Sequence, residues 1–144
     1  MNVKPFAYIM IYFSVLGLLL SGYLSYNTLF APAGCSTALI TCGGETPVEI
    51  LGVSQCIYGF FMFLATGAVA IVIMYSKKPS RWLSTQVVLG IISSLFGGGL
   101  SAYELWFRNP APTTMPSCVY GFFLFLGVLI TTLITKNAMR STES

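Results

Sequence analysis

Four long apolar stretches dominate this sequence of 144 residues. They span approximately residues 6–30, 57–75, 82–107 and 118–135. A bilayer core about 30 Å thick needs about 20 apolar residues of helix, because each residue advances the helix by about 1.5 Å. Backbone groups surrounded by lipid must form their hydrogen bonds within their own segment, so each stretch is predicted to be a transmembrane helix.

The composition leaves little room for a separate soluble domain. Hydrophobic residues make up 56% of the chain and charged residues 8%, whereas a soluble domain has about a quarter charged residues. We therefore predict one all-α integral membrane domain over residues 1–144, a four-helix bundle in contact with the lipid bilayer. The first stretch is too long for the apolar region of a signal peptide, so it is expected to remain as a helix. The polar tail, 137–144, is expected to fray.

The absence of histidine restricts the chemistry. It excludes histidine-ligated haem, zinc sites that contain histidine, and Ser-His-Asp or Cys-His catalysis. We expect no metal and no haem. The groups that remain reactive are mainly the four cysteines, a few carboxylates and the tyrosines.

The basic residues predict the orientation in the membrane. Six of the seven Lys and Arg residues flank the four stretches on one side, which we assign to the cytoplasm. They are Lys4, Lys77, Lys78, Arg81, Lys136 and Arg140. Both termini are then cytoplasmic, and the segments 31–55 and 108–117 lie on the outer face of the membrane. We expect this membrane to be the cell membrane, that is, the inner or plasma membrane. The net charge of +3 reflects this topology, and we expect no nucleic-acid partner.

The second and fourth stretches begin with nearly the same sequence. QCIYGFFMFL at 55–64 matches SCVYGFFLFL at 117–126, and LSGY at 20–23 more weakly matches LSAY at 100–103. The chain therefore reads as two repeated helical hairpins in parallel orientation, related by a pseudo-twofold axis along the membrane normal. Duplication alone explains such a repeat, but it gives Cys56 and Cys118 equivalent positions.

All four cysteines are expected at or beyond the outer membrane surface. An even number of cysteines in an oxidising compartment favours disulfides, and four cysteines allow three connectivities. Pairing of Cys35 with Cys42 closes a short loop, and pairing of Cys56 with Cys118 joins the outer ends of two helices. One interpretation is that both disulfides are purely structural.

A second interpretation is redox chemistry. Cys56 and Cys118 fall at predicted helix N-termini, where unpaired N–H groups and the helix dipole stabilise a thiolate. A thiolate is the species that performs thiol–disulfide exchange. Cys35 and Cys42 on the outer loop would pass a disulfide to or from that pair.

These features together resemble the vitamin K epoxide reductase family of membrane thiol oxidoreductases. The resemblance covers most of the chain. It rests on SGYLSY at 21–26, the outer loop with two cysteines, ILGV at 50–53, Tyr58-Gly59, SAYEL at 101–105 and Pro116-x-Cys118.

The resemblance implies a bundle around a quinone, either ubiquinone or menaquinone. Family members use a Cys-x-x-Cys pair at the head of the fourth helix, and a loop pair relays electrons to it from a thioredoxin-like exported protein. By position Cys118 matches the second cysteine of that pair, and Cys35 and Cys42 match the loop pair. Met115 replaces the first cysteine, and Cys56 has no counterpart in the family.

We therefore expect a quinone-linked thiol–disulfide oxidoreductase. Cys118 and Cys56 form its membrane pair, and Cys35 and Cys42 form its shuttle. The alternative, favoured by the incomplete Cys-x-x-Cys, is a non-catalytic subunit or scaffold of a larger membrane complex, in which the disulfides brace the outer loops. A transporter or channel would need buried charges that the stretches lack.

Four further residues have predicted roles. Tyr58, Tyr120 and Phe122 are candidate quinone contacts, although an interfacial aromatic belt also explains the two tyrosines. Glu104 is the sole ionisable residue within a stretch and has Arg108 at position i+4, so we expect a surface ion pair. The alternative is that Glu104 contacts a quinone or takes part in proton transfer.

Overall fold

The computed structural model describes residues 3–30, 49–108 and 117–143. Within these ranges it contains four long α-helices: α1 (Lys4–Phe30), α2 (Gln55–Tyr75), α3 (Pro79–Tyr103) and α4 (Ser117–Glu143). By length and composition all four are able to cross a membrane. The predicted all-α fold with four helices of membrane-spanning length is confirmed.

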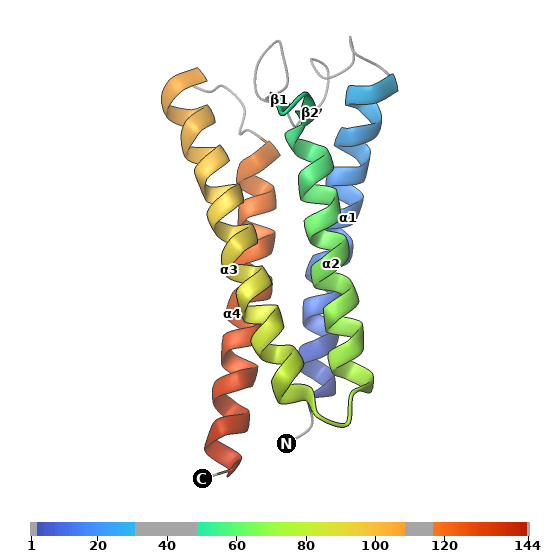
Figure 1. Cartoon of the computed structure of the whole chain (residues 1–144), viewed down its shortest axis with the longest axis vertical. Coiled ribbons are helices and arrows are strands. Elements are labelled where there is room, and N and C mark those ends of the chain that lie inside the picture. The colour runs from blue at the N-terminus through green and yellow to red at the C-terminus, as the bar shows by residue number, and fades with distance from the viewer. Residues whose placement is uncertain (1–2, 31–48, 109–116, 144) are drawn as a thin grey trace.

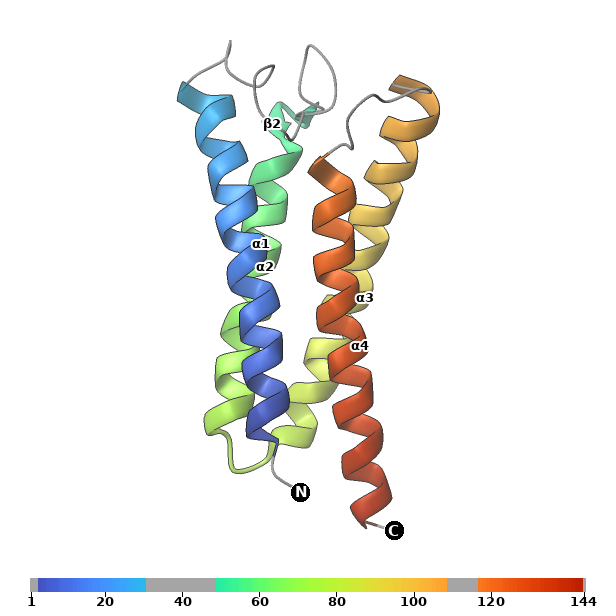
Figure 2. The same ribbon diagram turned by 180° about the vertical axis from the view of Figure 1, so that it is seen from behind.

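The helices form one elongated bundle (Figures 1 and 2). α1 packs against α2 and α3 against α4, and the two pairs meet through α1–α4 and α2–α3 contacts. Both chain ends lie at the end of the bundle where α2 turns into α3. The first residues of α2 and α4 lie towards the other end, so Cys56 and Cys118 are placed away from both chain ends.

A short hairpin leads directly into α2. Strands β1 (Glu49–Ile50) and β2 (Val53–Ser54) pair antiparallel around Leu51-Gly52. Both turn residues have positive φ, 54° and 76°, as a two-residue hairpin turn of type I′ requires. The hydroxyl of Ser54 then accepts a hydrogen bond of 3.4 Å from the backbone N–H of Cys56, which caps α2. The hairpin therefore fixes where α2 begins.

The ends of α3 and α4 differ from expectation. A π-helical turn, η2 (Glu104–Arg108), follows α3 directly. The tail was predicted to fray from residue 137. This was wrong for residues 137–143, because α4 continues without interruption to Glu143. Met139 packs against a buried cluster that includes Ala7 and Met10 of α1, so apolar contacts stabilise this last part of the helix.

Small and polar side chains fill the contacts between helices. Ser14 and Thr66 are fully buried, with their hydroxyl oxygens 3.4 Å apart across the α1–α2 contact. The Gln86 side chain of α3 donates a hydrogen bond of 3.2 Å to the backbone carbonyl of Thr66. Close packing and interhelical hydrogen bonds are the forces that hold helices together in lipid, where the hydrophobic effect between helices is weak.

Candidate functional site

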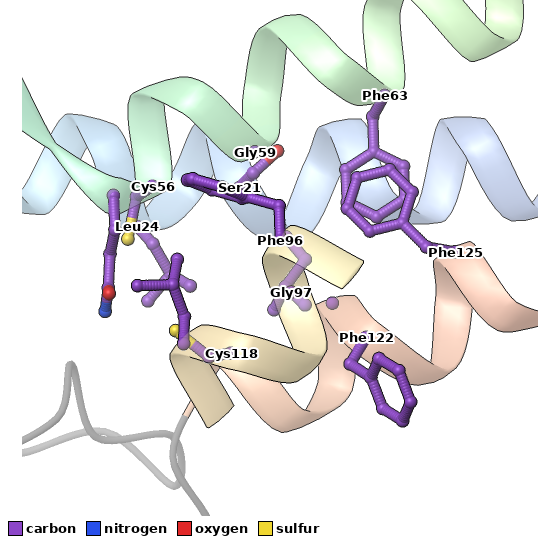
Figure 3. A pocket seen from close by; sticks show the side chains of 14 residues that line it. Ser21, Leu24, Cys56, Gly59, Phe63, Phe96, Gly97, Cys118, Phe122 and Phe125 are labelled. Atoms are coloured by element: carbon purple, nitrogen blue, oxygen red, sulfur yellow. The ribbon is translucent and has the colours of Figure 1, made fainter. Parts of the chain in front are cut away.

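Cys56 and Cys118 line one cavity near the hairpin end of the bundle. The cavity has a volume of about 60 Å³, and all four helices contribute to its almost entirely apolar wall. Figure 3 shows the sulfur atoms of Cys56 on α2 and Cys118 on α4 towards the same end of the cavity. The rings of Phe63 and Phe125 stack at the other end, with centroids 3.8 Å apart and planes 6° apart.

Each cysteine is the second residue of its helix, because α2 begins at Gln55 and α4 at Ser117. The predicted placement at helix N-termini is therefore confirmed. Cys56 is buried and Cys118 is half-buried, and neither forms a disulfide in this structure. Cys35 and Cys42 lie outside the described residues, so their pairing stays a prediction.

Four pairs of equivalent positions in the sequence repeat contribute to the wall of the cavity. Cys56 corresponds to Cys118, Gly59 to Gly121, Phe63 to Phe125, and Leu20 to Leu100. α1 and α3 also share a local feature. Ser21 donates to the carbonyl of Gly17 at 2.6 Å, and Ser101 donates to that of Gly97 at 2.7 Å. The cavity thus lies where the two halves of the chain meet.

One polar pair departs from this equivalence. The side-chain amide of Gln55 donates a hydrogen bond of 2.8 Å to Oε1 of Glu104. Glu104 is 1% exposed and Gln55 is 3% exposed. Oε2 of Glu104 and Oε1 of Gln55 have no hydrogen-bond partner among the described residues. The repeat places Leu24 and Ser117 at the corresponding positions, so this polar link is present in only one half.

The prediction of a surface ion pair for Glu104 was therefore wrong. Counting i+4 along one helix assumes α-helical spacing, but the π-helical turn begins at Glu104 and changes that spacing. The partner of Glu104 comes instead from the start of α2. The side chain of Arg108 lies outside the part of the chain that the structure describes.

The three candidate quinone contacts fall in different places. Phe122 lines the cavity. Tyr58 is not part of its wall, and its hydroxyl donates a hydrogen bond of 3.0 Å to the carbonyl of Ile50, which ties the hairpin to α2. Tyr120 is also absent from the wall and is 42% exposed.

The volume of the cavity limits what it holds in this conformation. An apolar protein cavity that binds benzene measures about 150 Å³, and this one measures about 60 Å³. A ring of the size of benzene or larger therefore fits only if the lining side chains move apart. Gly121 borders open space, because a Cβ atom added there would meet nothing within 4 Å.

Gln55 is the candidate site residue that the sequence analysis missed. It precedes Cys56, lines the cavity and holds Glu104. The sequence repeat contained a signal for this residue. In an otherwise matching motif, the second stretch has the long amide side chain of Gln55 where the fourth has the hydroxyl of Ser117.

A comparison of the chain with protein-family models, with curated proteins and with solved structures finds no match. The resemblance to the vitamin K epoxide reductase family therefore stays a prediction.

Proposed function

We propose that this chain is a membrane thiol–disulfide oxidoreductase with Cys56 and Cys118 as its membrane redox pair and a quinone as its electron acceptor. The observation that supports the proposal is the shared position of the two thiols at one end of an apolar cavity. The resemblance to the vitamin K epoxide reductase family points to the same activity. The distribution of basic residues favours the inner or plasma membrane, with the cysteines on its outer face.

The proposed reaction balances as follows. Oxidation joins Sγ of Cys56 to Sγ of Cys118 and releases two electrons and two protons. A bound quinone would accept both electrons and both protons, and it would leave as hydroquinone. The apolar wall offers the sulfur atoms few polar neighbours, which would limit competing reactions with water.

Glu104 gives the site a proton acceptor. Its carboxyl is buried and hydrogen-bonded to Gln55, the residue that directly precedes Cys56. We assign the unpartnered Oε2 to receive the thiol proton of Cys56 and to pass it on to the quinone, while the bond from Gln55 holds the carboxyl in place. General base catalysis by a carboxylate needs no histidine, in agreement with the composition.

The loop cysteines complete the proposed relay. The Cys56–Cys118 disulfide exchanges with the Cys35 and Cys42 thiols, and the loop disulfide then oxidises a dithiol in a thioredoxin-like exported protein. Each exchange breaks one S–S bond and forms another, so electrons are conserved until the membrane pair is reoxidised.

The test is a turnover assay with purified protein in lipid nanodiscs. Reduced thioredoxin-like protein and ubiquinone or menaquinone are added, and quinone reduction is followed by absorbance. Wild type and the exposed-surface control Leu95→Ala should turn over, whereas Cys56→Ser and Cys118→Ser should each be inactive. Absence of quinone-dependent thiol oxidation in wild type, or full activity of either cysteine variant, would overturn the proposal.

The small volume of the cavity favours a second candidate, a non-catalytic subunit of a larger membrane complex. In that case the cysteines are structural and resist mild reductant. Extraction in a mild detergent followed by size-exclusion chromatography distinguishes the two candidates. A stable heteromeric complex without turnover supports the subunit, and a free monomer with readily reducible cysteines contradicts it.

A further inference from the structure

A second cavity lies at the opposite end of the bundle from the cysteines. It has a volume of about 300 Å³ and opens between the first turns of α3 and the last turns of α4. Its polar side chains are Ser80, Arg81 and Ser84 of α3 and Lys136 and Arg140 of α4. Small-molecule sites begin at about 300 Å³, so the cavity is large enough for a small polar group.

Three positive charges converge on this cavity, and none of them has a negative partner among the side chains that the structure describes. Arg81, Lys136 and Arg140 are all exposed. Among the side chains that the structure describes, Glu104 is the only carboxylate, and it lies at the other end of the bundle. No ion pair therefore neutralises the three cations within the described part of the chain.

The position of Arg81 strengthens the case for an anion. Arg81 lies in the first turn of α3, which begins at Pro79. The first turn carries the positive end of the helix dipole, where anions are favoured and cations disfavoured. A bound anion would offset this unfavourable position, and the unpaired N–H groups of the first turn would attract it as well.

The surface next to the cavity is apolar. Val88 lies one turn beyond Ser84 on α3 and is 56% exposed, and Leu133 lies one turn before Lys136 on α4 and is 41% exposed. Residues three or four apart lie on the same face of a helix, so the basic cavity borders an apolar surface that faces outward. A matching ligand has an anionic head and a hydrocarbon tail.

We propose that this cavity binds the phosphate head group of an anionic phospholipid, with the acyl chains lying along Val88 and Leu133. Basic pockets between membrane helices are a known setting for such head groups. Free phosphate shares the charge but not the tail, so the apolar border favours the lipid. The proposal is independent of the redox chemistry at the other end of the bundle.

Trp82 offers a direct readout, because it is next to Arg81 and 38% exposed. The chain has two tryptophans, and Trp106 lies in η2 at the other end. In a Trp106→Phe background, quenching of Trp82 by brominated phosphatidylglycerol in phosphatidylcholine vesicles reports lipid at the cavity. We expect half-maximal quenching at a mole fraction about tenfold lower than for brominated phosphatidylcholine.

The variants separate a specific site from general surface charge. The triple variant Arg81→Gln, Lys136→Gln, Arg140→Gln should lose the preference for phosphatidylglycerol. The control Lys77→Gln, Lys78→Gln removes two charges from the α2–α3 turn, outside the cavity, and should keep most of it. The triple Arg81→Lys, Lys136→Arg, Arg140→Lys keeps every charge and should also keep the preference, which would show that the preference follows the charge at these positions.

Three results would overturn the proposal. The first is equal quenching by the two brominated lipids. The second is an equal loss in the cavity variant and in the turn control, which would mean attraction by overall charge. The third is removal of the preference by inorganic phosphate at constant ionic strength, which would assign the cavity to a soluble anion.

Discussion

Gln55 and Glu104 are joined by a buried hydrogen bond of 2.8 Å between the start of α2 and the end of α3. A carboxyl group buried among membrane helices is costly unless it has a partner. The amide of Gln55 supplies that partner, whereas the repeat places Leu24 where Glu104 would be. The polar link is therefore a specialised feature of one half of the bundle, and its Gln55 directly precedes Cys56.

The Gln55–Glu104 bond should show strong energetic coupling. Gln55→Leu or Glu104→Leu alone leaves the other polar group buried without its partner, so each should lower the free energy of unfolding by about 1–3 kcal/mol. The double variant replaces both groups by apolar ones and should cost less than the sum of the two single variants. Reversible unfolding in mixed detergent micelles, followed by circular dichroism, measures all three. Additive losses would show that the two side chains are not coupled.

Glu104→Gln separates the proposed proton transfer from packing. The new amide keeps an oxygen that accepts from Gln55 but no longer takes up a proton. Under the proposed function, quinone-dependent turnover should fall by about a hundredfold, while the free energy of unfolding changes by less than about 1 kcal/mol. The turnover assay and the unfolding assay are run on the same preparation. Unchanged turnover would remove Glu104 from the reaction but would leave the cysteine pair in place.

Gly17 lies where α1 and α2 approach closely. A Cβ atom at this position would overlap the ring of Phe63, which is itself stacked on Phe125. Gly17→Ala should therefore lower the free energy of unfolding by about 1–3 kcal/mol through overpacking. Gly99→Ala is the matched control, because a Cβ atom there meets nothing within 4 Å. It should be neutral or stabilising by up to about 1 kcal/mol, since alanine favours a helix. Equal stability of the two variants would contradict the close approach.

Tyr58 should hold the β1–β2 hairpin onto α2. Tyr58→Phe removes the hydrogen bond to the carbonyl of Ile50, and we expect a loss of about 1 kcal/mol that is confined to the hairpin. Hydrogen exchange of the amides of residues 49–54 should become faster by about fivefold, whereas exchange in the middle of α2 should not change. The control is Tyr120→Phe at the equivalent position of α4, where no change at the hairpin is expected. Equal protection of the hairpin in all three proteins would refute this role of Tyr58.

The helices were predictable because bilayer thickness converts directly into the length of an apolar run. The limits of α3 and α4 were less accurate. α3 begins at Pro79 and α4 continues to Glu143, so both extend through polar residues that an apolar run does not include. The hairpin around Leu51-Gly52 was missed because each strand has only two residues, too short for an alternating pattern.

The site was predictable only where the repeat identified it. The repeat placed Cys56 and Cys118 at equivalent positions, and both line the cavity. The burial of Glu104 was not predictable, because it depends on contact with Gln55 in another helix and on a π-helical turn. A pattern along a single helix contains neither piece of information.

The unequal burial of the two thiols gives the site a direction of approach. Cys118 is half-buried, whereas Cys56 is buried and packs against Leu24. An alkylating reagent is therefore expected to label Cys118 faster than Cys56. Two cysteines that the duplicated sequence makes look interchangeable are thus expected to react at different rates, and in the proposed relay the mixed disulfide with a loop cysteine is expected on Cys118 of α4.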